Sequence, residues 1–467
     1  ADSSTKQITF GPYDDGQATW SPTADEIAFT SNRTDEPDGN SNRDIWVVSA
    51  DTAQAGALPE RITSNSGSDS EPSWSPDGDE LTYVSVIEPE LIWYATDHLA
   101  TAARSGENET VHTVDLDRSV AKPKYSSDGG AIYFLVLDHG MRYLATFGLG
   151  SSELGRLISG ERSVTAFSVS SNGVTAVLIA DANRPAEIFI LDDAGLRQVT
   201  HANDELLSGL HLASTEKVTF ASKDGTQVEA FVVKPPNFNP ETRYPTILWI
   251  HGGPVAQFEY GFRRFEPKLF AENGYVVVMV NPRGSVGYGQ GFARAIWQDW
   301  GNKDYGDVIA AIAHVIELGY AAPDRLGVGG WSYGGMLTDY VITKTTRFAG
   351  AISGASEAFY RANYGHDHYQ LQWELEMGLP WENPELWDRI SPFTHIDKVE
   401  TPTMFIGGEK DWNVPIMNSE QLYQALRRRG VETLLVVYPG EHHGIRRPSF
   451  QRDRFERYLG WFGKYVK

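Results

Sequence analysis

The sequence predicts two domains, an N-terminal β-propeller over residues 1–210 and a C-terminal α/β-hydrolase domain over residues 211–467. Three observations lead to this prediction. One short pattern recurs in the first part, a G-x-S-x-G motif stands between an apolar segment and a helix, and apolar strands alternate with amphipathic helices in the second part. A chain of 467 residues is also too long for one ordinary hydrophobic core.

The recurring pattern is a strand, a tight turn and a second strand. Copies that begin at Ala18, Pro72 and Pro123 match well, and another at Ala166 matches less closely. An Asp-Gly or Asn-Gly pair in the later copies supplies the positive φ that a tight hairpin turn needs. Units of about 50 residues with about four strands each are typical of propeller blades, and a β-sandwich is the alternative.

Only about four to five such blades fit into the first 210 residues, whereas propellers of this repeat type usually have more. The first copy also begins almost at residue 1. We therefore expect a propeller that lacks N-terminal blades, through truncation or processing, unless it closes as a smaller ring. A complementing N-terminal chain or a homo-oligomer would be the matching partner.

Charge is distributed unevenly along the chain. The formal net charge is −22; residues 1–210 carry 33 acidic and 13 basic side chains, and residues 211–467 carry 29 and 27. This acidity argues against nucleic acid or an anionic membrane as a partner. A solvated acidic surface is its simplest interpretation, and attraction of cationic substrates is the alternative.

Several other features bound the function and the location. The absence of cysteine excludes disulfides and thiol chemistry. No segment approaches the roughly 18 uncharged apolar residues of a membrane span, and no signal-like segment follows Ala1. We expect no membrane partner, and a periplasmic or extracellular location is favoured over a cytoplasmic one.

The character of the sequence changes near residue 210. A hairpin is predicted over residues 219–233, and a proline-rich segment follows it. Continuous apolar strands that alternate with helices imply a parallel sheet covered on both faces. The predicted strands cover residues 246–250, 275–280, 325–329, 350–353, 403–406 and 433–438, and the predicted helices cover residues 306–318, 419–429 and 452–465.

The motif Gly330-Trp-Ser-Tyr-Gly-Gly335 identifies the candidate nucleophile, Ser332. Between a strand and a helix, G-x-S-x-G forms a sharp turn that exposes the serine Oγ, with flanking glycines that let the neighbouring backbone come close. The N-terminal end of the following helix favours developing negative charge.

A serine nucleophile needs a base, and the base needs an orienting acid. His443 lies in a loop after the last predicted strand and is the candidate base, with His442 as its neighbour. Asp411 follows an earlier strand and is the candidate acid, with Glu409 as the competitor. The order Ser, Asp, His along the chain is the one expected for this fold.

An oxyanion hole requires backbone N–H groups that point at the developing charge. Tyr333, directly after the nucleophile, supplies one such group. The segment His251-Gly-Gly-Pro254 follows the first long strand, and Gly253 is the candidate second donor, with Gly252 as the alternative. His251 itself is expected to be a structural hydrogen-bonding residue.

Two further segments are candidates for substrate binding. Residues 281–289 follow the second strand and are expected to support the active site, with Arg283 bridging loops or contacting substrate. Residues 359–381 are rich in aromatic side chains, including Tyr364 and Trp373. These aromatics form part of a substrate pocket or pack within a helical insertion.

Five motifs in the second part occur in a characteristic order: HGGP at 251–254, NPRGSVGYG at 281–289, GWSYGG at 330–335, EKDWNVP at 409–415 and EHHGI at 441–445. With the repeats before them, they make the chain resemble the prolyl oligopeptidase family of serine peptidases. The resemblance covers essentially the whole chain. It is greatest to the acylaminoacyl peptidase-like and dipeptidyl peptidase-like branches.

This resemblance implies a peptidase that acts on short peptides through an acyl-enzyme, without metal or cofactor. It implies Ser332, Asp411 and His443 as the catalytic triad, and a propeller that restricts access to the active site. In dipeptidyl peptidases, propeller glutamates hold the free amine of the substrate. Glu88 and Glu90 are the candidates here, with ordinary surface acids as the alternative.

Two other functions are compatible with these residues. An esterase would use the same triad with a different pocket. A non-catalytic protein would use the propeller for interactions and would not need the intact Ser332, Asp411 and His443.

Overall fold

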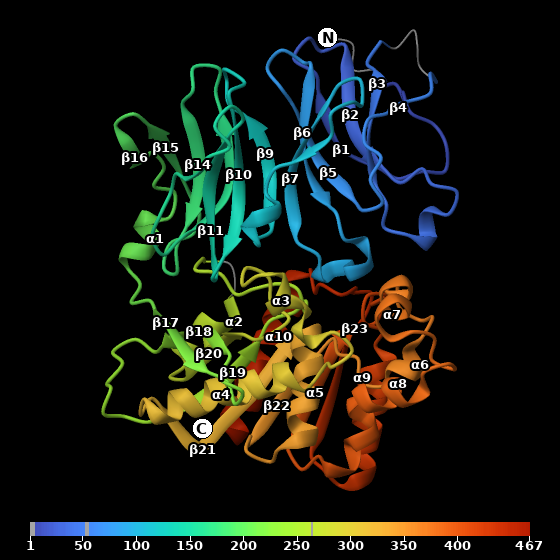
Figure 1. Cartoon of the computed structure of the whole chain (residues 1–467). Helices are drawn as coiled ribbons and strands as arrows, with labels where there is room; N and C mark the ends of the chain where they lie inside the picture. The colour runs from blue at the N-terminus through green and yellow to red at the C-terminus, as the bar shows by residue number, and fades with distance from the viewer. Residues whose placement is uncertain (1–4, 52–55, 263–264) are drawn as a thin grey trace. The chain divides into compact units, whose positions relative to one another are not determined.

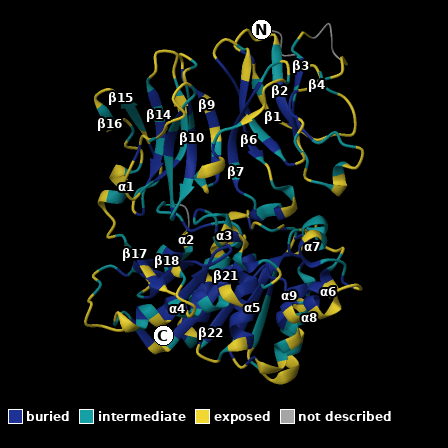
Figure 2. Ribbon diagram, viewed as in Figure 1, coloured by how far each residue is buried: buried dark blue, intermediate teal, exposed yellow. Residues whose placement is uncertain are grey.

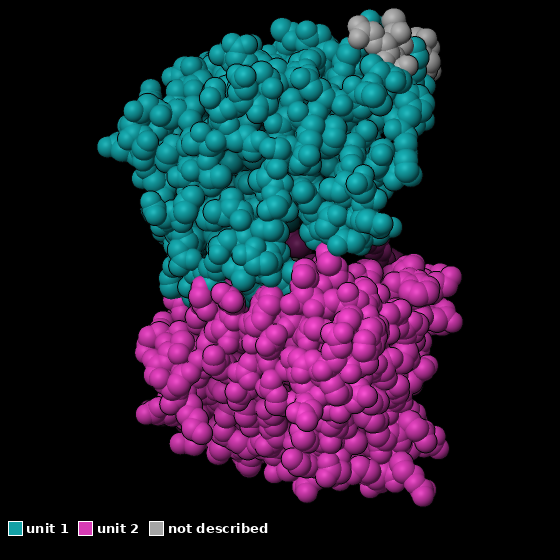
Figure 3. Space-filling view, turned by 45° about the vertical axis from the view of Figure 1, so that its right-hand side comes forward, with its two compact units in different colours: residues 1–205, 259–261, 286–290 teal, residues 206–258, 262–285, 291–467 magenta. Residues whose placement is uncertain are grey.

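The computed structural model describes residues 5–51, 56–262 and 265–467. The chain divides into two compact units (Figure 3). The first unit comprises residues 1–205 with the short segments 259–261 and 286–290, and the second comprises residues 206–258, 262–285 and 291–467.

Antiparallel four-stranded blades follow one another along the first unit (Figure 1). The third and fourth blades are joined through one parallel pair, Arg142 with Ser163. The strands are β1 (Asp15–Trp20), β2 (Glu26–Ser31), β3 (Asp44–Ser49) and β4 (Glu60–Arg61); β5 (Asp69–Trp74), β6 (Glu80–Val86), β7 (Asp97–Ala103) and β8 (Thr110–Val111); β9 (Val120–Tyr125), β10 (Ala131–Asp138), β11 (Met141–Gly148) and β12 (Leu154–Arg156); β13 (Ser163–Val169), β14 (Thr175–Ala180), β15 (Glu187–Asp192) and β16 (Gly195–Gln198). Short helices interrupt or follow them: η1 (Pro37–Gly39), η3 (Pro89–Tyr94), η4 (Val114–Leu116) and α1 (Asp204–Ser208).

The core of the first unit lies between successive blades. One apolar cluster joins Ile45 and Val47 of the first blade to Leu81 and Tyr83 of the second. Two further clusters join the second blade to the third and the third to the fourth. Sheets that pack face on face in chain order form a propeller, as the repeats predict. The described residues between Asp15 and Gln198 hold four blades.

The repeated serines explain why the hairpins look alike. In the second copy, Ser75 Oγ donates to Asp77 Oδ1 at 2.6 Å and accepts the Glu80 N–H at 3.0 Å. Ser126 makes the same two contacts in the third copy, with Asp128 and Ala131. The turn glycines Gly78, Gly129 and Gly173 all have positive φ, as predicted.

The second unit is built around one eight-stranded sheet of order β17-β18-β20-β19-β21-β22-β23-β24. From β20 to β24 all neighbours are parallel, and β17 and β18 form an antiparallel edge. Each predicted strand of the second part is present. The strands are β17 (Ser214–Ala221), β18 (Gln227–Lys234), β19 (Tyr244–Ile250), β20 (Val276–Asn281), β21 (Ala321–Trp331), β22 (Gly350–Gly354), β23 (Thr403–Gly408) and β24 (Thr433–Tyr438).

Helices cover both faces of this sheet. A Cβ on Gly327 of β21 would lie 2.9 Å from Phe462, and one on Gly330 would lie 2.6 Å from Gly334, which belongs to a different helix. Residues at odd and even positions of a strand point to opposite faces, so these two helices lie on opposite sides. The helices are α2 (Phe265–Glu272), α3 (Gln290–Ala293), α4 (Lys303–Glu317), α5 (Tyr333–Lys344), α6 (Tyr360–Asn363), α7 (Gln370–Met377), α8 (Pro384–Ile390), α9 (Met417–Arg429) and α10 (Pro448–Tyr465), with η5 (Arg294–Ile296) and η6 (Pro392–Lys398).

The three predicted helices are present as α4, α9 and α10. The α5 helix is buried over almost its whole length, as its dark colour in Figure 2 shows. Because α5 is packed on nearly all sides, the position of Ser332, the residue directly before it, is well defined. Within the described residues, no helix combines the length and apolar character that crossing a bilayer requires.

Candidate active site

Ser332 stands at the junction between the central strand β21 and the helix α5. Its backbone has φ 62° and ψ −127°, a conformation that non-glycine residues rarely adopt. Strain of this kind persists only where the surroundings hold it, and it concentrates at functional positions. The geometry is that of a nucleophile elbow.

Two positions after Ser332 must be glycine because neighbouring backbone lies too close for a side chain. A Cβ on Gly334 would lie 2.2 Å from the carbonyl oxygen of Ile250, and one on Gly335 would lie 2.4 Å from that of Gly354. The elbow is therefore pressed against the ends of β19 and β22. In an open α/β sheet, ligands bind beyond the carboxyl ends of the strands where the strand order reverses, which here is between β19 and β21.

The His251–Pro254 segment follows β19 and lies beside Ser332. A Cβ on Gly252 would be 3.2 Å from the Cβ of Ser332 and 3.8 Å from its Oγ. The buried imidazole of His251 contacts Ser285 Oγ at 3.0 Å and the Gly252 carbonyl oxygen at 2.7 Å. These contacts fit a structural role for His251, and they connect the glycine loop to the segment of residues 281–289.

His443 and Asp411 form a hydrogen-bonded pair. The Nδ1 of His443 lies 2.8 Å from Oδ2 of Asp411, whose side chain is 1% exposed. The other carboxylate oxygen of Asp411 accepts the N–H groups of Asn413 and Val414 at 2.9 and 2.8 Å. Glu409 instead accepts the Gly440 N–H at 2.8 Å. The pairing therefore brings together Asp411 and His443, while the neighbouring His442 is exposed.

Two hydrogen bonds hold the loop that carries His443 in place. Buried Glu441 accepts the Arg446 N–H at 2.5 Å and closes the loop on itself. Trp331, the residue before Ser332, donates from Nε1 to the His443 carbonyl oxygen at 3.0 Å. Sequence reasoning did not single out Trp331. The only available signal was an aromatic residue at the first variable position of G-x-S-x-G.

We expect Trp331→Phe to lower kcat by roughly 10-fold with little change in KM, because it removes the donor that positions the His443 loop and keeps an aromatic ring there. Steady-state kinetics on a peptide substrate measure this. Trp20→Phe, at a position 59% exposed in the first unit, is the matched control and should leave kcat unchanged. An unchanged kcat in Trp331→Phe would show that Trp331 does not position the His443 loop.

Tyr333, the first residue of α5, is anchored by its side chain. Its hydroxyl donates to the fully buried Asp304, which also accepts the Gly301 N–H at 3.0 Å. Burial raises the pKa of Asp304 to about 6. The N–H of Tyr333 lies at the positive end of the helix dipole, which is where an oxyanion donor is needed.

Comparison with known proteins relates most of the second unit to one family. Residues 260–467 match the sequence model of the prolyl oligopeptidase family. This region is therefore similar to the domains of that family. The uncharacterized peptidase YuxL of Bacillus subtilis is 37% identical over 293 residues, which are 61% of this chain and 44% of that protein. Dipeptidyl-peptidase 5 of Porphyromonas gingivalis is 26% identical over 465 residues, which are 96% of this chain and 66% of that protein.

A solved structure supports the same fold across both units. Pyrococcus horikoshii acylaminoacyl peptidase matches with a TM-score of 0.84 at 24% identity, over 98% of this chain and 71% of that one. The predicted combination of a β-propeller and an α/β-hydrolase domain is thus confirmed. The chain spans less than two thirds of the length of both curated relatives.

A buried carboxyl group lies on helix α5, which begins directly after Ser332. Asp339 of α5 is completely buried, and Ser356 donates a hydrogen bond to it. Its Oδ1 has no hydrogen-bond partner among the described residues. Burial raises the pKa of Asp339 from 3.8 to about 7.

This shift makes stability depend on pH. The unfolded chain releases the Asp339 proton near pH 3.8, and the folded protein holds it up to about pH 7, so the Asp339 contribution to stability falls as pH rises through this window. We expect the stability gain of Asp339→Asn over wild type to grow by about 3 kcal/mol from pH 5 to pH 8. Urea denaturation at both pH values measures it. The substitution Asp397→Asn, at an exposed position, is the matched control, and parallel profiles for Asp339→Asn and wild type would contradict the expectation.

Arg283 forms ion pairs with carboxylates of the second unit. Its guanidinium donates to Asp307 at 2.7 and 2.9 Å and also binds Asp224, and the side chain of Arg283 is 7% exposed. Desolvation of an ion pair is offset only when the partners are well satisfied, as they are here. The contacts fit the loop-bridging interpretation and leave no donor facing a substrate, so we do not retain Arg283 for substrate binding.

The aromatic residues of the 359–381 segment pack against one another. Trp373 is buried, contacts the rings of Trp300 and Tyr360, and donates from Nε1 to Asp367 at 2.9 Å. Tyr364 is half-buried and donates to Glu374 at 2.7 Å. Both contact patterns fit the packing interpretation of this helical insertion.

Glu88 and Glu90 differ in their surroundings within the first unit. Glu88 is half-buried at the start of η3 and accepts a hydrogen bond from Gln290 Nε2 at 2.7 Å. Glu90 is exposed. Of these two glutamates, only Glu88 is therefore held in one orientation.

No group of three or more His, Cys, Asp or Glu side chains suited to a metal ion occurs among the described residues.

Proposed function

We propose that this protein is a serine peptidase that cleaves short peptides through an acyl-enzyme intermediate. The observation that carries the proposal is the His443–Asp411 pair at 2.8 Å in a region similar to the prolyl oligopeptidase family, with Ser332 at a strained turn after the central strand. Each of these three groups has one role in the reaction.

In the proposed mechanism, His443 takes the proton of Ser332 Oγ as that oxygen attacks the carbonyl carbon of the substrate. Asp411 accepts a hydrogen bond from Nδ1 of His443, which leaves Nε2 as the base and stabilises the imidazolium that forms. The Tyr333 and Gly253 N–H groups bind the oxyanion. His443 then protonates the leaving amine, and water hydrolyses the acyl-enzyme by the same steps in reverse.

For the substrate class, we propose removal of dipeptides from free N-termini. The support is the relation to dipeptidyl-peptidase 5 over 96% of this chain. Release of N-acylated amino acids is the second candidate, because the fold matches an acylaminoacyl peptidase.

Matched peptides with free and acetylated N-termini separate these candidates. Wild type and Ser332→Ala are incubated with each peptide, and the products are identified by mass spectrometry. Dipeptides released only from the free peptide support a dipeptidyl peptidase, and acetyl-amino acids from the blocked peptide support the second candidate. Equal cleavage by Ser332→Ala would contradict the proposed nucleophile.

A further inference from the structure

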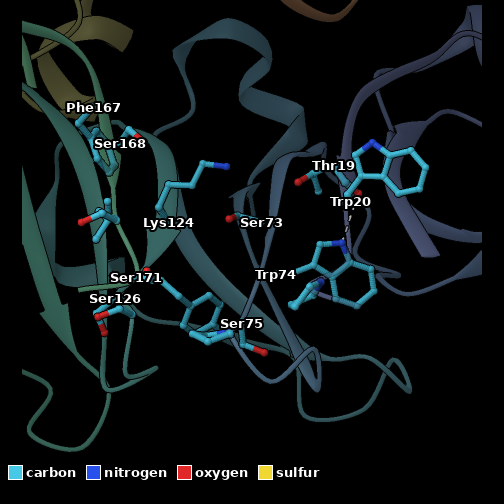
Figure 4. A pocket seen from close by; sticks show the side chains of 16 residues that line it. Thr19, Trp20, Ser73, Trp74, Ser75, Lys124, Ser126, Phe167, Ser168 and Ser171 are labelled. Atoms are coloured by element: carbon cyan, nitrogen blue, oxygen red, sulfur yellow. Dashed lines mark hydrogen bonds between the residues drawn. The ribbon is translucent and has the colours of Figure 1, made fainter. Parts of the chain in front are cut away.

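The first unit contains a pocket between the first strands of its blades (Figure 4). Its volume is about 370 Å³, which is within the range of small-molecule sites. The strands β1, β5, β9 and β13 all contribute to its lining. None of its lining residues belongs to the candidate active site.

The four sequence repeats contribute one equivalent residue each to this pocket. Two positions before the turn serines Ser21, Ser75, Ser126 and Ser170, the residues are Thr19, Ser73, Lys124 and Ser168. All four line the pocket. Three repeats therefore present a small hydroxyl side chain at this position, and the third presents a lysine. Packing of the repeat does not require a long cationic side chain here, since the other copies do without one.

Lys124 points into the pocket, as Figure 4 shows. Its ammonium group forms no hydrogen bond and no ion pair with any residue that the structure describes. The surrounding protein lowers the pKa of its ammonium group by desolvation, and Glu71 acts in the opposite direction. By contrast, Lys122, two residues earlier, donates to the Thr165 carbonyl oxygen at 3.0 Å. Lys124 is solvent-exposed in this open pocket, and a cation without a close partner gains from an anion that enters the pocket.

Aromatic and hydroxyl groups complete the lining. The indole of Trp20 is 59% exposed, and Trp74 and Phe167 lie on either side of Lys124 in the view of Figure 4. Aromatic rings provide apolar area with a polar edge, and serine and threonine hydroxyls can donate to an oxyanion. The pocket thus combines one cation, several hydroxyl donors and an apolar wall.

We propose that this propeller pocket binds a small organic carboxylate that carries an apolar or aromatic group, with Lys124 as the carboxylate ligand. The C-terminus of a short peptide and an N-acylated amino acid both have this chemistry. This pocket shares no residue with the candidate active site, so the binding proposal does not depend on the proposed peptidase function.

The test compares N-acetyl-L-phenylalanine with its uncharged amide by isothermal titration calorimetry. The full chain with Ser332→Ala is the background, so that neither probe is consumed. Lys124→Thr replaces the lysine by the residue of the first repeat, and Lys122→Thr is the matched control outside the pocket. We expect Lys124→Thr to weaken carboxylate binding by roughly 10-fold or more and Lys122→Thr to leave it unchanged.

Two further results decide the proposal. The amide should bind weakly to all three proteins, because it lacks the charge that Lys124 recognises. Carboxylate affinity that is equal in Lys124→Thr and in the background protein would overturn the proposal, since binding would then lie elsewhere. Absence of carboxylate binding to the background protein would overturn it as well. Circular dichroism of each variant verifies that the fold is retained.

Discussion

Replacement of Ser332 or His443 by alanine should lower kcat by about 10⁴-fold or more. Without the Ser332 hydroxyl no acyl-enzyme forms, and without the His443 imidazole the hydroxyl keeps its proton. Because the two groups act in one proton transfer, the double variant should be no less active than either single variant. Steady-state and single-turnover kinetics on a peptide anilide measure these effects.

His442→Ala is the matched control for the base. His442 is exposed, whereas His443 is paired with Asp411, so His442→Ala should keep nearly full activity. Alanine at position 332 can retain the backbone conformation of the elbow, and thermal unfolding should change little. If His442→Ala abolished turnover and His443→Ala did not, the assignment of the base would be wrong.

Gly334→Ala should reduce kcat by at least about 100-fold, although residue 334 takes no part in the chemistry. The added Cβ would lie 2.2 Å from the Ile250 carbonyl oxygen and 3.0 Å from that of His251. Both contacts are with backbone, so the strain cannot be relieved by a side-chain rotation. The elbow and the glycine loop would have to separate, and the nucleophile would move away from its partners.

Gly463→Ala is the matched control for this substitution. Gly463 is exposed on α10, and no atom lies within 4 Å of an added Cβ. We expect normal turnover and a stability gain of about 0.5–1 kcal/mol, because alanine is the better helix former. Kinetics and chemical denaturation of both variants give the comparison. Normal turnover by Gly334→Ala would mean that the elbow tolerates displacement.

Much of the fold follows from short-range patterns in the sequence. The turn glycines, the serine–aspartate pairs and the apolar strands are local features, and their period and order determine the type of each domain. The strands and helices predicted for the second unit are all present for this reason. Blade-to-blade packing follows as well, since each strand-turn-strand unit has an apolar face to bury.

Sequence patterns alone predict the two domain types, the candidate elbow at Ser332 and the order of the motifs along the chain. The folded structure shows which side chains meet, because contacts between distant segments depend on how the sheet and the blades pack. It paired His443 with Asp411 while Glu409 contacts Gly440, enclosed Arg283 between Asp307 and Asp224, and left Lys124 without a partner in the propeller pocket. The sequence motifs predicted Asp411 as the partner of His443, but they carry no information about the surroundings of Lys124.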